Sequence, residues 1–100
     1  MYDPVQWVFS SEKISENEIE LQFKADIQEG WHLYSQHLPD GVDAYPTEFI
    51  FINTEEYELI DQMIEPEPIK QADPMFDNLV LPYFKDEVVF RQIIRINSSS

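Results

Sequence analysis

Hydrophobic and polar residues alternate without exception from residue 18 to residue 28. The apolar positions of this segment are Ile19, Leu21, Phe23, Ala25 and Ile27. A strict period of two predicts a β-strand with one face toward the core and the other toward solvent. Glu29 and Gly30 follow, and because glycine tolerates positive φ, we expect a turn there and a second strand at 31–35 that pairs back onto the first.

Shorter segments of the chain also have strand character. Val5, Trp7 and Phe9 alternate with mostly polar residues and predict a first strand, followed by a polar connection or a ragged strand end over residues 10–17. The apolar run at 47–52 is short enough for a strand that is covered on both faces. Further strands are predicted at 57–60 with an alternative end at 64, and at 69–72, 80–84 and 88–96.

The predicted strand at 88–96 places a row of side chains on one face, namely Val88, Phe90, Gln92, Ile94 and Ile96. Short strands separated by turn signals, with no helical period anywhere, predict an all-β fold, and an immunoglobulin-like β-sandwich in particular. A barrel is the second choice. We expect a single domain over residues 1–97 and a polar tail at 98–100.

The charge balance excludes some classes of partner. The chain has six Lys and Arg residues and twenty Asp and Glu residues, which gives a net charge of −14. This charge repels phosphate backbones and anionic membrane surfaces, so we do not expect nucleic-acid binding. No stretch approaches eighteen apolar residues, so we expect no membrane insertion of this segment. Protein partners would meet the chain through apolar or aromatic contacts, or through a basic surface of their own.

Three segments together resemble a known family: Asp3-Pro4-Val5-Gln6-Trp7, then Gly30-Trp31-His32-Leu33-Tyr34-Ser35-Gln36, then Pro46-Thr47-Glu48-Phe49. They are similar to the N-terminal periplasmic domain of the transmembrane thiol-disulfide reductase DsbD and to related disulfide bond corrector and cytochrome c biogenesis proteins. The resemblance spans nearly all of the chain and implies an immunoglobulin-like sandwich in the periplasm. It also implies a function, the relay of electrons from a thioredoxin-like domain to periplasmic thiol-disulfide proteins.

The resemblance assigns roles to particular residues. Tyr34 matches one of the tyrosines beside the family's cysteine pair, and His32 replaces the other. Phe76 is the candidate cap aromatic, in a turn-rich loop that begins at Asp73 and also contains Met75. These residues form the predicted partner-binding and cap surface. An apolar pair in a polar loop has an alternative explanation, because it can simply fold back onto the core.

The chain has no cysteine. In the family, the cysteine pair follows the strand that matches residues 88–96, so either this chain is truncated before the pair and its strands or it is a shortened member that lost the chemistry. In both cases this chain cannot exchange thiols, because exchange requires a thiolate. The alternative function is a non-catalytic, immunoglobulin-like domain for protein binding or structure.

An early end of the domain has a predicted consequence for association. If the terminal strands are absent, the strand at 88–96 is left with an unpaired edge rich in Val, Ile and Phe. Such an edge pairs readily with another copy, so we predict dimers or strand exchange through it.

Period two also separates the residues of the segment at 31–35. We assign Trp31 and Leu33 to the core and His32 and Tyr34 to the opposite, less buried face. No cofactor and no metal site is expected, because His32 and His37 lack the further ligands that zinc needs. Acidic residues at 40–43 and 73–77 could offer oxygen ligands to calcium, although neither set fits the twelve-residue calcium loop.

Overall fold

The computed structural model describes residues 4–42, 44–52 and 55–97. Within the last range, it describes the backbone of Met75 but not its side chain. The predicted tail at 98–100 lies outside this part of the chain. The chain is all-β, as predicted, with two antiparallel sheets and one 3-10 turn. Among the described residues, no helix is long and apolar enough to cross a membrane.

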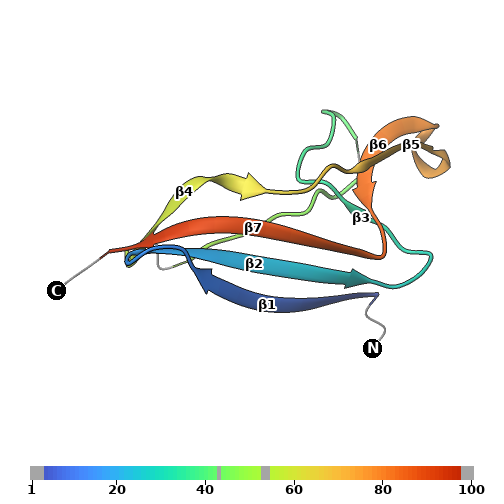
Figure 1. Cartoon of the computed structure of the whole chain (residues 1–100). Helices are drawn as coiled ribbons and strands as arrows, with labels where there is room; N and C mark the ends of the chain where they lie inside the picture. The colour runs from blue at the N-terminus through green and yellow to red at the C-terminus, as the bar shows by residue number, and fades with distance from the viewer. Residues whose placement is uncertain (1–3, 43, 53–54, 98–100) are drawn as a thin grey trace.

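The first sheet has the strand order β1-β2-β7-β4. Its strands are β1 (Val5–Lys13), β2 (Glu18–Ile27), β7 (Glu87–Ile96) and β4 (Tyr57–Ile64). Figure 1 shows them as one long layer, with the second sheet at the end where β7 begins. Of the two predictions for residues 10–17, the strand end is correct for residues 10–13, which continue β1 and pair with residues 19–22 of β2.

The strand β7 lies inside the sheet and not at its edge. It pairs with β2 on one side and with β4 on the other. The prediction of an unpaired edge at 88–96 is therefore wrong, and β1 and β4 form the edges of this sheet. The prediction of dimers through that edge loses its basis, and dimerisation through another sheet edge stays a prediction. The predicted face of β7 is correct, since Val88, Phe90, Gln92 and Ile94 are all buried, while Ile96 is exposed.

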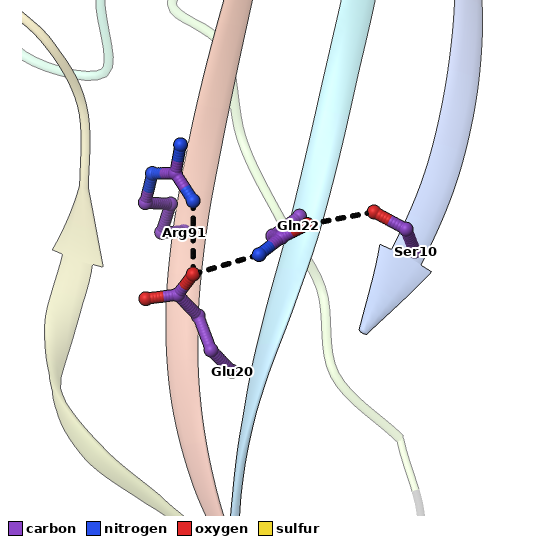
Figure 2. A network of polar contacts seen from close by, with 4 residues as sticks. All are labelled: Ser10, Glu20, Gln22 and Arg91. Carbon is purple, nitrogen blue, oxygen red and sulfur yellow. Dashed lines mark hydrogen bonds and ion pairs between the residues drawn. The ribbon is translucent and has the colours of Figure 1, made fainter. Parts of the chain in front are cut away.

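The other face of this sheet carries a polar network across three strands (Figure 2). Ser10 donates to Gln22, and Gln22 Nε2 and Arg91 Nη1 each lie 2.9 Å from Glu20 Oε1. The hydrogen bond from Gln22, which has the larger effect, and the hydrogen bond from Arg91 both lower the pKa of the Glu20 carboxyl group. Further ion pairs on this face join Arg95 to Glu18 and Lys24 to Glu87 and Asp26. Exposed pairs of this kind contribute little energy each, but they help to fix the strand register.

The second sheet has the order β3-β6-β5. Its strands are β3 (Leu33–Tyr34), β6 (Leu79–Phe84) and β5 (Ile69–Asp73), and the 3-10 turn η1 (Pro74–Phe76) follows β5. The segment after the first long strand was expected to pair back onto it, but β3 pairs with β6 instead. Both edges of β2 are occupied, by β1 and β7, and Gly30 at a φ of 89° turns the chain toward the other sheet.

The apolar run at 47–52 is not a strand of either sheet. Phe49 and Phe51 are half-buried, whereas Ile50 and Ile52 are 85% and 71% exposed. The prediction of a strand covered on both faces is therefore wrong. Alternate side chains do point inward, but one face of this segment is open to solvent among the described residues.

The core lies between the two layers, where the first sheet meets the second. Ala25, Ile27, Val88 and Phe90 come from the first sheet and Phe84 from the second. Phe90 is fully buried, with its ring centroid 5.1 Å from that of Phe49 and 5.6 Å from that of Phe84. Trp7, Phe23, Leu33 and Met63 pack around this centre.

Candidate functional site

Five polar and aromatic residues lie in contact, and we refer to them as the Tyr34 cluster. They come from the second sheet, from the turn after β5 and from the position just before β3. They are His32, Tyr34, Asp73, Phe76 and Tyr83. The sheet register explains the arrangement, because Tyr34 lies opposite Tyr83 and β5, the other edge strand of the same sheet, ends at Asp73. Antiparallel pairing thus gathers side chains from three separate segments on one face.

Tyr34 is the central residue of the cluster. Its hydroxyl donates to Asp73 Oδ2 over 2.8 Å, although the two residues are 39 apart in the sequence. The backbone carbonyl of Tyr34 accepts a hydrogen bond of 2.6 Å from Thr47 Oγ1, which holds β3 in place. Burial, followed by the hydrogen bond and the negative charge of Asp73, raises the pKa of Tyr34 to about 12.

Phe76 packs against Tyr34 from the turn that follows Asp73. The two rings are nearly perpendicular, with an interplanar angle of 86° and centroids 6.2 Å apart. Asp77 and Asn78 then both take positive φ, and the backbone N–H of Asn78 donates to the carbonyl of Asp73. Asparagine and aspartate tolerate this conformation better than most residues, so the sequence itself favours the reversal that brings Phe76 back over Tyr34.

His32 and Tyr83 form the other half of the cluster. Their rings stack with centroids 4.0 Å apart and an interplanar angle of 22°. Tyr83 is buried, and its hydroxyl donates to Gln71 Oε1 on β5 over 2.9 Å. His32 covers Tyr83 while staying exposed itself. The cluster therefore combines exposed and half-buried aromatic rings with the carboxylate of Asp73.

A second polar group lies next to the cluster, around Glu65. Ser35 Oγ donates to Glu65 Oε2 over 2.5 Å, and the backbone N–H and Nε2 of Gln36 both donate to Glu65 Oε1. Burial would raise the pKa of Glu65, but the hydrogen bonds from Ser35 and Gln36 outweigh it and lower the pKa. Ser35 Oγ also accepts from the backbone N–H of His37, so one carboxylate holds the chain just after β3.

The bond between Tyr34 and Asp73 predicts a late ionisation. Because the folded state raises the pKa of Tyr34, the stability that its neutral hydroxyl contributes is fully present below the unfolded pKa, near pH 10. It is lost as the pH rises through the folded value of about 12. In a tyrosine titration followed by ultraviolet absorbance, Tyr34→Phe should remove the last ionisation, and Asp73→Asn should move it to lower pH. An unchanged last ionisation in Tyr34→Phe would contradict this assignment.

The structure brings together four of the five residues predicted for the partner and cap surface. His32, Tyr34, Asp73 and Phe76 all belong to the cluster, whereas the side chain of Met75 lies outside the described part of the chain. The expected division of faces is only partly correct. Leu33 packs against the core, but Trp31 is 46% exposed and not a core residue. The turn that ends at Trp31, closed by its N–H donating to the Gln28 carbonyl, explains the difference.

Sequence reasoning missed several residues of this region. Tyr83, Gln71 and Glu65 gave no local signal, because their partners depend on the register of the second sheet. Gln92 did have a signal, as a polar residue on an apolar face of β7. Its buried Nε2 lies within hydrogen-bond distance of the carbonyls of Ile60 and Asp61, where β4 is irregular and Asp61 has positive φ. Gln92 therefore has a structural role, because its side chain stabilises the irregular part of β4.

The arrangement offers contact surface more than reaction chemistry. The chain contains no cysteine, so the cluster can supply no thiolate. Among the described residues, no group of three or more His, Asp or Glu side chains is placed to hold a metal ion. What the cluster does offer is exposed and half-buried aromatic area around a carboxylate, a composition that is common in protein-binding surfaces.

The comparisons with known proteins leave the family of this chain open. A scan against protein-family models, a search of curated proteins and a search of solved structures each found no match.

Proposed function

We propose that this chain is a protein-binding module that docks thioredoxin-like redox proteins through the Tyr34 cluster. The module is of the DsbD N-terminal kind, with an immunoglobulin-like sandwich fold and a periplasmic location. Electron relay would belong to cysteines that this chain does not contain. The role of this chain is to bind the partner and orient it.

The contact between Tyr34 and Phe76 carries the proposal. In the family that the sequence resembles, tyrosines of this strand lie beside the cysteine pair, and an aromatic side chain of the cap loop shields the same pair. Here the two rings are in edge contact, and Asp73 links the same strand to the same loop. A phenylalanine that merely filled a gap in the core would not need a tyrosine hydroxyl and a carboxylate beside it.

The charge of the chain also favours recognition of a folded protein surface over other ligands. With a net charge of −14, the chain repels anionic ligands at long range. At the cluster itself, aromatic rings can bury apolar area while Asp73 accepts hydrogen bonds from a partner backbone. A thioredoxin-like partner would fit such a surface by presenting apolar side chains and backbone N–H groups to it.

Binding to a thioredoxin-like protein tests the proposal. The isotope-labelled chain is titrated with a thioredoxin-like protein whose second active-site cysteine is replaced by serine, and amide shifts are followed by NMR. We expect the largest shifts at residues 32–34 and 73–76. Phe76→Ala should weaken binding about tenfold or more, as for other central aromatic residues of interfaces.

The matched control is Val80→Ala, which truncates an apolar side chain that is 56% exposed on β6. Val80 lies opposite Ala72 and not opposite Asp73, so it points to the other face of the sheet, away from the cluster. Val80→Ala should leave the affinity unchanged, and urea unfolding should show that both variants are folded. Wild-type affinity in Phe76→Ala would contradict the proposal, as would shifts confined to other faces. Either result would favour the alternative function, an immunoglobulin-like domain for binding or structure with no redox partner.

A further inference from the structure

An apolar groove lies on the core side of the first sheet, beside strand β1. It has a volume of about 420 Å³ and is bounded by Phe9 on one side and by residues 48–52 on the other. Leu21 and Phe23 of β2 also line it. No residue of the Tyr34 cluster lines this groove, so whatever it binds does not depend on the proposed function. We call it the Phe9 groove.

The rim of the Phe9 groove exposes an unusual amount of apolar surface. Phe9 is 67% exposed, Ile50 is 85% exposed and Ile52 is 71% exposed. Scattered apolar residues are normal on a surface, but large ones gathered at one groove mark interaction sites. Phe9 does not reach into the core either, since its ring contacts only the edge of Phe23 among the aromatic residues described.

The backbone along one side of the groove is open as well. Thr47 is bonded to Tyr34 and Ser35, and the Ile52 carbonyl accepts from the hydroxyl of Tyr57, so both ends of the segment are held. Between them, no backbone hydrogen bond of residues 48–51 is found within the described part of the chain. Extended backbone with free donors and acceptors can accept an added strand.

The charged residues around the groove favour an added strand of one kind, with basic side chains. Glu48 lines the groove, and Glu55 and Glu56 are exposed just before its lining residue Tyr57. None of the three has a salt bridge among the described residues, and the only basic residue on this face of β1 is Lys13. A second copy of the chain, itself at −14, is disfavoured here by repulsion, whereas a basic segment is attracted.

We propose that the Phe9 groove binds an extended, basic polypeptide segment of a partner protein. The segment pairs its backbone with residues 48–51 and places alternate apolar side chains on Phe9 and Leu21. Its lysine or arginine side chains alternate with these and lie near Glu48. The groove is thus a site for strand addition, separate from the Tyr34 cluster.

Synthetic peptides of defined pattern test this proposal. The probe is a short peptide of alternating valine and lysine, measured by fluorescence anisotropy with the whole chain. A block isomer, with all valines before all lysines, has the same charge and composition but cannot present one apolar face. A peptide of alternating valine and glutamate keeps the pattern and reverses the charge. We expect only the alternating valine–lysine peptide to bind well.

Two pairs of substitutions locate the binding. The double variant Ile50→Ser, Ile52→Ser should weaken the binding about tenfold or more, because both side chains line the groove on the same face as Glu48 and the apolar stems of the peptide's lysines would pack on them. The control double variant Val8→Ser, Val80→Ser removes side chains that are 54% and 56% exposed and do not line the groove. It should bind as the wild type does.

Three results would overturn the proposal. Equal binding of the block isomer would show attraction by net charge alone. Equal effects of the two double variants would place the peptide elsewhere. Sedimentation that shows a dimer of the wild-type chain, lost in Ile50→Ser, Ile52→Ser, would identify a second copy as the occupant. Each of these is separate from the Phe76→Ala test, since Phe76 does not line the groove.

Discussion

Replacing Phe90 by alanine should destabilise the domain by about 3–5 kcal/mol, the usual cost of truncating a buried phenylalanine. Phe90 is fully buried on β7, and its ring packs against those of Trp7, Phe49 and Phe84. A domain of this size has a total stability of about 5–15 kcal/mol, so the loss would be a large fraction of it. Urea unfolding followed by tryptophan fluorescence measures the change.

The chain offers a matched control for this substitution. Phe9→Ala makes the same chemical change at a side chain that is 67% exposed, and it should cost about 1 kcal/mol or less. Should Phe90→Ala fail to fold, Phe90→Leu still tests the packing, because it keeps most of the volume and should cost less. Similar losses in Phe9→Ala and Phe90→Ala would contradict the placement of the core.

Replacing Glu65 by alanine should cost about 2–4 kcal/mol, because it removes a charged acceptor shared by several donors. Ser35 is 1% exposed, and its hydroxyl would lose the partner to which it now donates. The two donors of Gln36 would lose theirs as well. Glu67→Ala, at an exposed position two residues further on, is the control and should have little effect.

The effect of Glu65 should also depend on pH. Its pKa is lowered in the folded state, so the stability that its ionised form contributes is present above the unfolded pKa, near pH 4.3. That stability is lost as the pH falls through the folded pKa. The gap in unfolding free energy between the wild type and Glu65→Gln should therefore shrink in acid. A gap that stays constant from neutral pH into the acid range would contradict the lowered pKa.

Local pattern was enough to predict most strands of this protein but not their neighbours. The alternation of 18–28 corresponds to β2, and the predicted segments 69–72, 80–84 and 88–96 correspond to β5, β6 and β7. Period two shows which side chains share a face, but it does not show which strand lies alongside. This is why the position of β7 in the centre of its sheet was missed.

The run at 47–52 shows a second limit of the same kind. Four consecutive apolar residues, Phe49 to Ile52, are compatible with burial on both faces and with burial on one. Only the packing of the surrounding sheets decides, and here it leaves Ile50 and Ile52 in solvent. The exposed Trp31 is a similar case, since the turn before it changes the alternation.

The candidate site was predicted as far as its residues belong to recognisable segments. Tyr34 lies in the aromatic segment after Gly30, and Phe76 lies in a loop of turn-forming residues. The bonds of Glu65 to Ser35 and of Tyr83 to Gln71 were not foreseeable, because each joins segments whose relation is set by the second sheet. Such pairs become visible only when the strand register is known.

The central place of β7 also bears on how the chain folds. The strand β2 contacts it along its whole length, and the pair Glu18 and Arg95 that closes this ladder is 77 residues apart in the sequence. Joining such distant segments has a high entropic cost before any contact compensates for it, so folding should be slow for a domain of this size. During synthesis, β1 and β2 leave the ribosome long before β7. Until β7 emerges, the edge of β2 that β7 will occupy is unpaired, and the apolar face of the β1–β2 hairpin is uncovered. We expect this hairpin to be the part of the nascent chain most prone to aggregate.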